Sequence, residues 1–306
     1  MTGITIARCA ACRAPVVAGD RFCERCGARI HSEPEQPAGD RLELDRRLAA
    51  AISDRGLVHS RNEDAFALEV IDDHRIAAVV CDGISSSSAG DVAARSAARA
   101  AGDVLAAALG GPAGSSEAAT VEAAAAAHGA VQDVPWTTRA DRGMPSCTLV
   151  SALCRDGEIV LGSAGDSRGY WLEDGRVQQL TVDDSWAQEQ VTAGRMAPEQ
   201  ALADPRAHSI TNWIGPDAPQ RQPRLVVHRP ARPGRLVLCS DGLWNYASTV
   251  ARLGELVEAL PSGASAAAVA RALVDMAISR GGRDNITVVV ADIQPRSGGP
   301  DDQIHG

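Results

Sequence analysis

Short apolar segments joined by Asp-Gly pairs are the feature of this sequence that most restricts its fold. An Asp-Gly pair between two apolar segments favours a two-residue turn, because both residues tolerate the positive φ angles that such a turn needs. Two of these pairs, Asp156-Gly157 and Asp174-Gly175, lie within residues 147–181. They predict antiparallel β-hairpins built from Cys147–Cys154, Glu158–Ser163, Arg168–Leu172 and Arg176–Thr181.

Alanine-rich stretches stand before and after these hairpins. Alanine has the highest intrinsic helix propensity, so we expect helices at Ala89–Leu109, Glu117–Val131 and Ala264–Ser279. Apolar runs predict further strands at Arg75–Cys81, Leu225–His228, Arg235–Cys239 and Asn285–Asp292. Strands in hairpin order with flanking helices indicate an α+β layered fold.

The charge balance argues against binding to nucleic acid or to anionic lipid. The chain has 39 Asp and Glu residues against 30 Lys and Arg residues, a formal net charge of −9. Such a chain has no general electrostatic attraction for phosphate backbones, although the first 30 residues are locally basic. No stretch reaches the roughly 18 apolar residues that span a bilayer, and residues 1–8 lack the pattern of a secretory signal. We therefore expect a cytoplasmic protein without a membrane partner.

Four of the eight cysteines form two C-x-x-C pairs near the N-terminus. Each pair places two thiolates on one tight turn, and two pairs together can close a tetrahedral cage around zinc. A redox dithiol, or four cysteines without a shared function, is the alternative. The pattern resembles a short rubredoxin-like zinc ribbon, which we expect over residues 1–30 as a structural module that contacts a partner. Its zinc ligands would be Cys9, Cys12, Cys23 and Cys26.

Acidic residues recur where the apolar strands of the larger region stop. A single aspartate at a strand end is usually a turn residue or a helix cap. Several of them converging on one place would repel each other unless divalent cations neutralised them. Their oxygen ligands would select Mg²⁺ or Mn²⁺ rather than zinc, and two such ions can clamp a phosphoryl group. The residues in question are Glu63, Asp64, Asp82, Asp166, Asp241 and Asp284.

Five motifs resemble the protein phosphatase 2C family of metal-dependent serine/threonine phosphatases, and they occur in that family's order. They are Ser53-Asp54-Arg55-Gly56 with Arg61-Asn62-Glu63-Asp64-Ala65, Val80-Cys81-Asp82-Gly83, Gly165-Asp166-Ser167-Arg168, Cys239-Ser240-Asp241-Gly242-Leu243-Trp244 and Asp284-Asn285-Ile286-Thr287. The resemblance implies a β-sandwich of two antiparallel sheets flanked by helices on both faces, in four αββα layers. This catalytic domain would cover residues 47–294, after a polar linker at 31–46 and before a flexible tail at 295–306.

The resemblance also implies a centre for two Mn²⁺ or Mg²⁺ ions at one end of the sandwich. Asp82 would bridge the ions, and Asp64 would hold a metal-bound water. Asp241 and Asp284 would complete the shell of one ion, while Glu63 and the backbone carbonyl of Gly83 would serve the other. A water or hydroxide that bridges the ions would attack the phosphorus of phosphoserine or phosphothreonine, without a covalent intermediate.

The chain departs from the family where an arginine commonly grips the substrate phosphate. That position holds His59, which is shorter and mostly neutral at pH 7, so its hold on phosphate would be weaker. His59 could make a reduced phosphate contact, Arg55 or Arg61 could replace it, or His59 could be an ordinary surface residue. Residues 84–88 also differ from the Gly-Gly-His type sequence of many relatives, and no general acid can be assigned there.

A third metal ion, which some bacterial members bind, is a further expectation. Asp183 matches one of its ligands. Asn245 stands where some relatives have an acidic residue, and an amide oxygen binds hard cations more weakly, which would weaken the third site. Asp166 and Arg168 match positions that are structural in the family, and residues 185–213 match the flap that selects substrates.

Two functions follow from these observations. The first is a Mn²⁺- or Mg²⁺-dependent phosphoprotein phosphatase that opposes a bacterial-type Ser/Thr kinase. The second is a weakly active or inactive pseudophosphatase or scaffold that binds phosphoproteins, with the ribbon as its interaction module, and His59 and the altered Ser85–Ser88 segment suggest it. Loss of a phosphate contact slows a reaction, whereas loss of a metal ligand abolishes it. The complete set of acidic ligands therefore favours the phosphatase.

Overall fold

The computed structural model describes residues 7–8, 14–16, 25–26, 40–111, 114–138 and 140–295. The chain divides into two compact units, residues 1–39 and residues 40–306. In the first unit, β1 (Ala7–Arg8) and β2 (Pro15–Val16) pair as a short antiparallel ladder. Three of the four predicted zinc ligands, and the predicted tail beyond residue 295, lie outside the described residues. The zinc ribbon therefore stays a prediction.

The second unit contains a five-stranded antiparallel sheet in the order β11-β8-β7-β6-β5. The predicted turn at Asp156-Gly157 joins β7 to β8, with φ angles of 55° and 82° at its two residues. These positive angles confirm the hairpin that the Asp-Gly pair predicted. The strands are β5 (Asp64–Val70), β6 (Ile76–Asp82), β7 (Leu149–Arg155), β8 (Glu158–Ala164) and β11 (Arg224–His228).

A six-stranded antiparallel sheet, in the order β10-β9-β12-β13-β4-β3, forms the other half of the sandwich. The second predicted turn, Asp174-Gly175, joins β9 to β10 with φ angles of 50° and 73°. The strands are β3 (Arg41–Asp45), β4 (Ala49–Asp54), β9 (Arg168–Glu173), β10 (Arg176–Gln179), β12 (Gly234–Cys239) and β13 (Ile286–Ile293).

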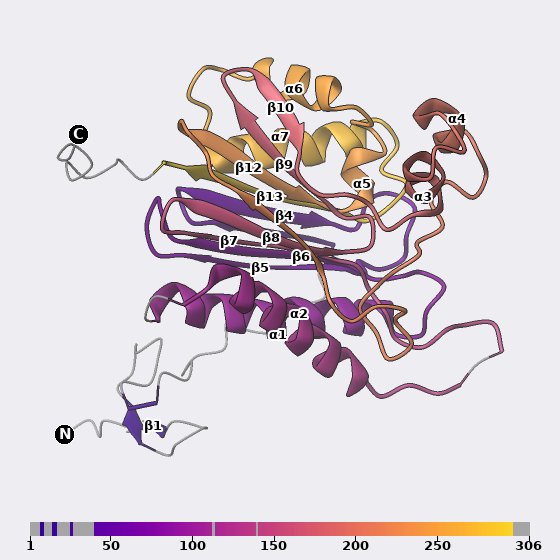
Figure 1. Ribbon diagram of the computed structural model, residues 1–306, viewed down its shortest axis with the longest axis horizontal. Helices are drawn as coiled ribbons and strands as arrows, with labels where there is room; N and C mark the ends of the chain where they lie inside the picture. The colour runs from indigo at the N-terminus through magenta and orange to yellow at the C-terminus, as the bar shows by residue number, and fades with distance from the viewer. Residues whose placement is uncertain are drawn as a thin grey trace, which may run out of the picture. The chain divides into compact units, whose positions relative to one another are not determined.

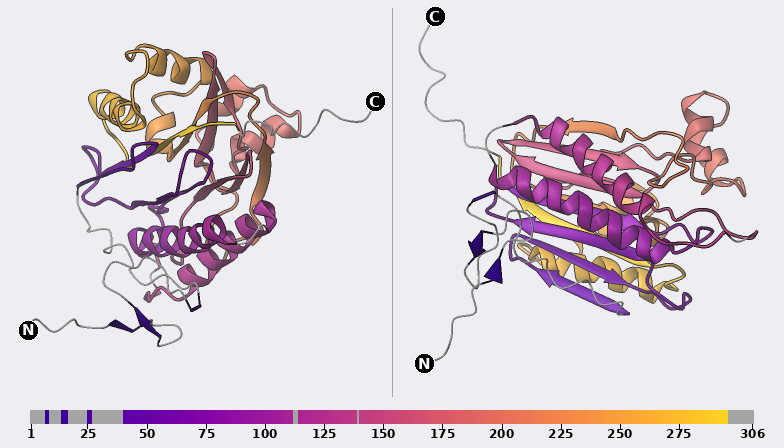
Figure 2. Two further views of the ribbon diagram at one scale, coloured as in Figure 1. Left: turned by 90° about the vertical axis from the view of Figure 1, so that its left-hand side faces the viewer. Right: turned by 90° about the horizontal axis from the view of Figure 1, so that it is seen from below.

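Helices cover the outer face of each sheet, as Figures 1 and 2 show. The five-stranded sheet is covered by α1 (Gly90–Gly110) and α2 (Ser116–Gln132), and the six-stranded sheet by α6 (Val250–Glu258) and α7 (Ala266–Ser279). One apolar cluster lies between the two sheets, and one lies under each helical layer. This arrangement confirms two antiparallel sheets flanked by helices on both faces.

Alanine side chains let α1 and α2 pack closely on the sheet. Ala93, Ala97 and Ala101 recur every four residues along one face of α1 and are fully buried. A Cβ added to Gly102 would lie 2.6 Å from the Cβ of Ala67 in β5, so the helix touches the sheet there. Although α1 has 21 residues, none of the helices in the described part of the chain is long and apolar enough to cross a bilayer.

The structure extends the larger unit into the predicted linker. Residues 41–45 form β3, which pairs with β4 at the edge of the six-stranded sheet. Leu42 and Leu44 alternate with polar residues and pack against the apolar cluster between the sheets. The linker prediction is therefore wrong for this stretch. A short edge strand with polar residues at every other position has no continuous apolar run, and its composition resembles that of a linker.

Gly242 offers a test of the close packing at the end of β12, where it lies in the short helix α5 (Asp241–Trp244). A Cβ added to Gly242 would lie 1.9 Å from the carbonyl oxygen of Asn285. A Cβ added to Gly129 in α2 would meet no atom within 4 Å. We expect Gly242→Ala to lower the free energy of unfolding by about 3 kcal/mol, because the backbone must move. Gly129→Ala should raise it by about 0.5–1 kcal/mol, because alanine favours the helix.

Denaturant unfolding followed by tryptophan fluorescence measures both changes. Similar stabilities for the two variants would contradict the close approach of Gly242 to the strand beside it.

Candidate metal centre

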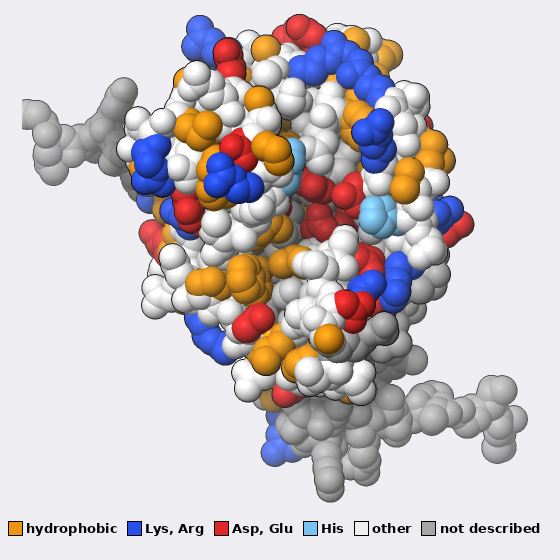
Figure 3. Space-filling view, turned by 90° about the vertical axis from the view of Figure 1, so that its right-hand side faces the viewer, with side chains coloured by type: hydrophobic (Ala, Val, Ile, Leu, Met, Phe, Trp, Pro, Cys, Tyr) orange, Lys and Arg blue, Asp and Glu red, His pale blue; other side chains and the backbone are white. Residues whose placement is uncertain are grey.

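Strand ends from both sheets bring acidic side chains together at one end of the sandwich. Asp64 begins β5 and Asp82 ends β6, and these residues are direct partners across the two strands. In the six-stranded sheet, Asp241 follows β12 and Asp284 precedes β13. These two strands are antiparallel neighbours. Figure 3 shows acidic side chains at the bottom of a hollow on this face. The structure therefore gathers acids as far apart in the chain as Asp64 and Asp284, at the predicted strand ends.

Two side chains outside the predicted set of site residues, Ser240 and Asn285, hold these strand ends together. The hydroxyl of Ser240 donates to Asp64 Oδ2 at 2.8 Å, which links the end of β12 to the start of β5. The side-chain oxygen of Asn285 accepts the backbone N–H of Glu63 at 2.7 Å, and its Nδ2 donates to two carbonyls of the loop before β5, at 2.8 Å and 3.1 Å. Each stands directly beside a predicted ligand in the sequence, and that position was the only available signal.

Burial and mutual repulsion make these carboxyl groups hold their protons more tightly than usual. Burial first, and nearby carboxylates second, raise the pKa of Asp82 and that of Asp166 well above the ordinary range. The same causes raise the pKa of Asp64 to about 7 and the pKa of Asp241 to about 6. Burial also raises the pKa of Glu63. Ionising the whole group at neutral pH therefore costs free energy unless positive charge is added.

Hydrogen bonds leave one oxygen without a donor on two of these carboxylates. Asp64 Oδ2 accepts from Ser240, and Asp241 Oδ2 accepts from Asn245 Nδ2 at 3.2 Å. Oδ1 of Asp64 and Oδ1 of Asp241 are buried and have no hydrogen-bond partner in the described part of the chain. A divalent cation, or a water bound to one, would satisfy such oxygens, and the cation would offset the repulsion between the carboxylates. The residues present fit hard divalent cations.

These side chains do not form a closed cage as they stand. Within the described stretches of residues 40–295, no three His, Cys, Asp or Glu side chains lie close enough together to hold an ion. Carboxylates that repel each other stay apart, so closing them around an ion would take movements of side chains. The assignment of Glu63, Asp82, Gly83, Asp241 and Asp284 as ligands remains a prediction.

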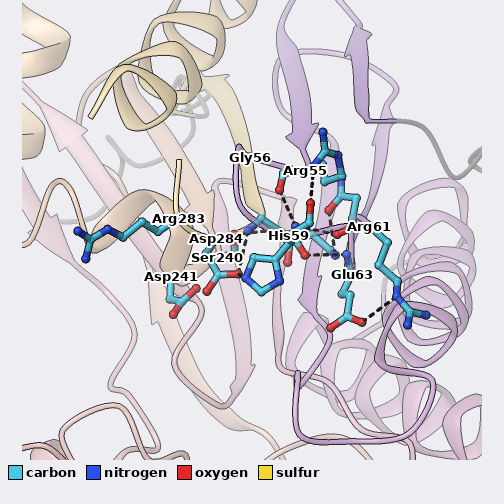
Figure 4. A network of polar contacts seen from close by, with 12 residues as sticks. Arg55, Gly56, His59, Arg61, Glu63, Ser240, Asp241, Arg283 and Asp284 are labelled. Carbon is cyan, nitrogen blue, oxygen red and sulfur yellow. Dashed lines mark hydrogen bonds and ion pairs between the residues drawn. The ribbon is translucent and has the colours of Figure 1, made fainter. Parts of the chain in front are cut away.

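The three candidates for a phosphate contact lie in different settings (Figure 4). His59 Nε2 lies 3.2 Å from Asp284 Oδ1, so its ring faces a predicted metal ligand. Arg55 donates through Nε to the carboxylate of Asp40 at 2.8 Å, and through Nη1 to the carbonyl of His59. Arg61 lies 3.4 Å from Glu63, and 58% of its side chain is exposed. Of the three, Arg61 keeps the most accessible guanidinium.

The segment after Gly83 is held by backbone contacts. A Cβ added to Gly83 would lie 2.5 Å from the carbonyl oxygen of Gly90, so only a glycine fits there. Arg142 Nη1 donates to the carbonyls of Ser85 at 3.3 Å and Ser87 at 3.1 Å. Residues 84–88 carry no side chain that acts as an acid near neutral pH, so no general acid is assigned to them.

Asp183, the predicted ligand of a third metal ion, is engaged elsewhere. Arg168 donates to both of its carboxylate oxygens, at 3.0 Å and 2.7 Å, and both residues are buried. The guanidinium of Arg168 also lies 3.8 Å from the centre of the Trp244 ring, whose N–H donates to the carbonyl of Asp166 at 2.9 Å. These contacts support structural roles for Asp166 and Arg168, and they argue against Asp183 as a metal ligand.

The flap (residues 185–213) is closed at its base by Asp184. The carbonyl of Asp184 accepts the backbone N–H of Thr211 at 2.8 Å, and its Oδ2 accepts from Asn212 Nδ2 at 3.4 Å. The same Oδ2 accepts the N–H of Gly165 at 3.2 Å, in the turn between β8 and β9. One residue therefore joins both ends of the flap to the sandwich. The flap carries two short helices, α3 (Trp186–Thr192) and α4 (Pro198–Leu202), which Figure 1 shows beside each other.

Comparison with known sequences gives consistent matches over the larger unit. Residues 57–276 match the family described as Protein phosphatase 2C. "Serine/threonine protein phosphatase PstP" of Mycobacterium tuberculosis is 35% identical over 245 residues, which cover 80% of this chain and 44% of the relative. "Serine/threonine phosphatase stp" of Listeria welshimeri is 29% identical over 241 residues, which cover 78% of this chain and 93% of the relative. The chain thus spans less than half the length of the mycobacterial relative.

Solved structures show the same architecture. The crystal structure of Mycobacterium tuberculosis PstP/Ppp matches with a TM-score of 0.63 at 32% identity, covering 83% of this chain and 100% of that one. The catalytic domain of PstP in complex with two manganese ions matches with a TM-score of 0.58 at 30% identity, covering 80% of this chain and 96% of that one.

Asp241→Asn should stabilise the metal-free protein more at pH 7.5 than at pH 5.5. The pKa values of Asp64 and Asp241, at about 7 and about 6, lie above those of an unfolded chain. Stability is therefore lost as the pH rises through these values, because the groups then ionise beside each other. Asparagine removes one of the charges. We expect a gain of several degrees in Tm at pH 7.5, since 1 kcal/mol shifts the Tm of a domain this size by about 2–4 °C.

Calorimetry in the presence of chelator measures this difference between variant and wild type. His128 and His228 have lowered pKa values, so they reduce the stability of the folded protein as the pH falls. Both proteins contain these histidines, so their contribution cancels when the variant is compared with wild type. Equal gains at both pH values, or a loss at pH 7.5, would show that the carboxyl groups do not repel each other.

Proposed function

This chain belongs to the protein phosphatase 2C family, and from that membership we propose that it is a metal-dependent phosphatase acting on phosphoserine and phosphothreonine in proteins. The observation that carries the proposal is the group of buried and half-buried carboxylates with raised pKa values, two of which have a buried oxygen without a donor. Transfer of a phosphoryl group to water depends on positioning and charge stabilisation, and cations held by such carboxylates supply both. The names of the matched relatives support the same activity.

Two Mn²⁺ or Mg²⁺ ions are the proposed cofactors. Bound at the centre, they would neutralise the carboxylates, polarise the phosphoryl group and lower the pKa of the attacking water. The two manganese ions of the PstP structure support this number. The groups that would hold them are Glu63, Asp82, the carbonyl of Gly83, Asp241 and Asp284.

Asp64 is the proposed acceptor for a water at the centre. It is the cross-strand partner of Asp82, so it lies beside the proposed bridging ligand. Ser240 holds its Oδ2, and its buried Oδ1 has no donor among the described residues. Oδ1 can therefore accept a hydrogen bond from a water and orient it.

Phosphorylated proteins are the proposed substrates, and a Ser/Thr protein kinase is the proposed opposing enzyme. The acidic side chains lie in a hollow that opens on the surface in Figure 3, which suits a phosphorylated side chain carried by another protein. Arg61, with its exposed guanidinium 3.4 Å from Glu63, is the cation best placed at this rim to meet a phosphate.

Hydrolysis of a phosphothreonine peptide by the full chain, with Mn²⁺, with Mg²⁺ and with chelator, tests the proposal. We expect hydrolysis only with a cation. Asp241→Asn should lower kcat by roughly 100-fold or more, because it removes a charge that holds the cation. Asp275→Asn is the matched control, since Asp275 lies on α7 and pairs with Arg41 at 2.9 Å, and it should hydrolyse at the wild-type rate. Equal, negligible rates in every sample would contradict the phosphatase activity and favour the alternative function, a scaffold that binds phosphoproteins.

We propose separately that residues 1–30 hold one structural zinc ion as a module that contacts a partner. The spacing of the two C-x-x-C pairs supports this proposal, and nothing in the described residues adds to it. The proposed ligands are Cys9, Cys12, Cys23 and Cys26.

Metal analysis of Cys23→Ser checks this site, and we expect about one zinc per chain to be lost with the thiolate. Cys154→Ala is the control, because burial raises the pKa of the Cys154 thiol to about 12 and keeps it protonated. It should retain the zinc. A wild-type zinc content in Cys23→Ser would contradict the proposed zinc site.

A further inference from the structure

The carboxylate of Asp284 is held at one oxygen only. Its Oδ1 accepts the backbone N–H of Asn285 at 2.8 Å and lies 3.2 Å from Nε2 of His59. Its Oδ2 receives no hydrogen bond from any residue that the structure describes. The backbone N–H of Asn285 and the imidazole of His59 both lie at Oδ1, and the other oxygen is left for a ligand from outside the protein.

The same division occurs at the neighbouring carboxylates. Asp64 gives one oxygen to Ser240 and keeps the other without a donor, and Asp241 does the same with Asn245. His59 lies beside Asp284 as a hydroxyl and an amide lie beside the other two. In each case a polar side chain is next to one carboxylate oxygen and leaves the other oxygen open.

The loop that carries His59 is itself anchored. Arg55 Nη1 donates to the carbonyl of His59, and the backbone N–H of Leu57 donates to the carbonyl of Gly282 at 2.7 Å. The His59 side chain is only 32% exposed, and Figure 4 shows its ring directed at the carboxylates. The loop thus presents the imidazole to Asp284, two residues beyond Gly282 in the chain.

The orientation of the ring decides what this imidazole can contact. Its Nε2 faces Asp284 Oδ1 at 3.2 Å, so this edge of the ring is turned to the carboxylate and not to the open hollow. A phosphate that approached the same nitrogen would meet the like charge of Asp284. The imidazole is therefore placed to contact Asp284 and not a phosphate.

We propose that His59 is a positioning residue for the metal centre: it orients Asp284 so that Oδ2 faces the cation, and it does not contact the substrate phosphate. This inference rests on the proposed metal-dependent function, and it assigns to His59 a different task from the phosphate contact expected from the sequence. Donors that orient metal ligands in this way typically change metal affinity by 10–100-fold. The loss of His59 should appear first in metal binding.

His59→Leu and His59→Gln separate the donor from the bulk of the side chain, because glutamine keeps an N–H near the position of Nε2 and leucine does not. His74→Leu is the matched control: His74 Nε2 lies 3.4 Å from Asp73 Oδ1, in the turn at the opposite end of β5 and β6. Mn²⁺ is titrated calorimetrically into the metal-free full chain, without substrate. We expect His59→Leu to bind Mn²⁺ about 10-fold more weakly, His59→Gln to stay close to wild type, and His74→Leu to match wild type.

The KM for a phosphothreonine peptide, measured at saturating Mn²⁺, completes the test. It should be the same for wild type and His59→Leu. Wild-type Mn²⁺ affinity in His59→Leu would overturn the proposal, and a raised KM with that affinity would assign His59 to the phosphate. Melting temperatures in chelator show whether each variant folds, and if His59→Leu does not, His59→Ala replaces it. A wild-type chain that binds Mn²⁺ yet hydrolyses nothing would refute the phosphatase and leave this inference standing.

Discussion

Asp64 and Asp82 face each other across one pair of strands, and the repulsion between them is the constraint on which the rest of the centre depends. Asp241 adds a third, half-buried carboxyl group from the opposite sheet, so the repulsion acts between the two halves of the sandwich. Neither sheet can relieve it by sliding, because the apolar cluster between the sheets fixes their spacing. The hydrophobic layers thus maintain an unfavourable arrangement of charge, and cations would turn that arrangement into a binding site.

The backbone of residues 284–285 shows how packing places a functional group. Gly56, at a φ of 73°, and Gly242 both press on this stretch, and a Cβ added to Gly56 would lie 2.2 Å from the carbonyl oxygen of Asp284. Asn285 then bonds to the loop before β5 with both ends of its amide. Asp284 is therefore held from the six-stranded sheet and from that loop together. A site built from loop ends gains its rigidity from such contacts rather than from the regular strands.

Features with a local cause could be predicted from the sequence. The turns at Asp156 and Asp174 need only two suitable residues, and both hairpins have the predicted form. The acids at the strand ends could also be predicted, because each of them stands beside an apolar run in the sequence. Features that depend on distant partners could not: Asp183 has no neighbour in sequence that reveals its buried pairing with Arg168. Likewise Ser240 acquires its role only because the fold places β5 beside it, and the strand β3 is stable only against the other sheet.

The closure of the flap at Asp184 makes the segment between its two ends largely independent of the metal centre. Both ends of residues 185–213 meet at one residue, so the segment between them can lengthen or change with little cost in closure entropy. Trp244 contacts the flap through His208, whose ring stacks on it with centroids 5.7 Å apart, while its N–H and Arg168 keep partners outside the flap. Most of the segment can therefore change in length and sequence while the carboxylates stay where they are, provided that the contact at Trp244 is kept.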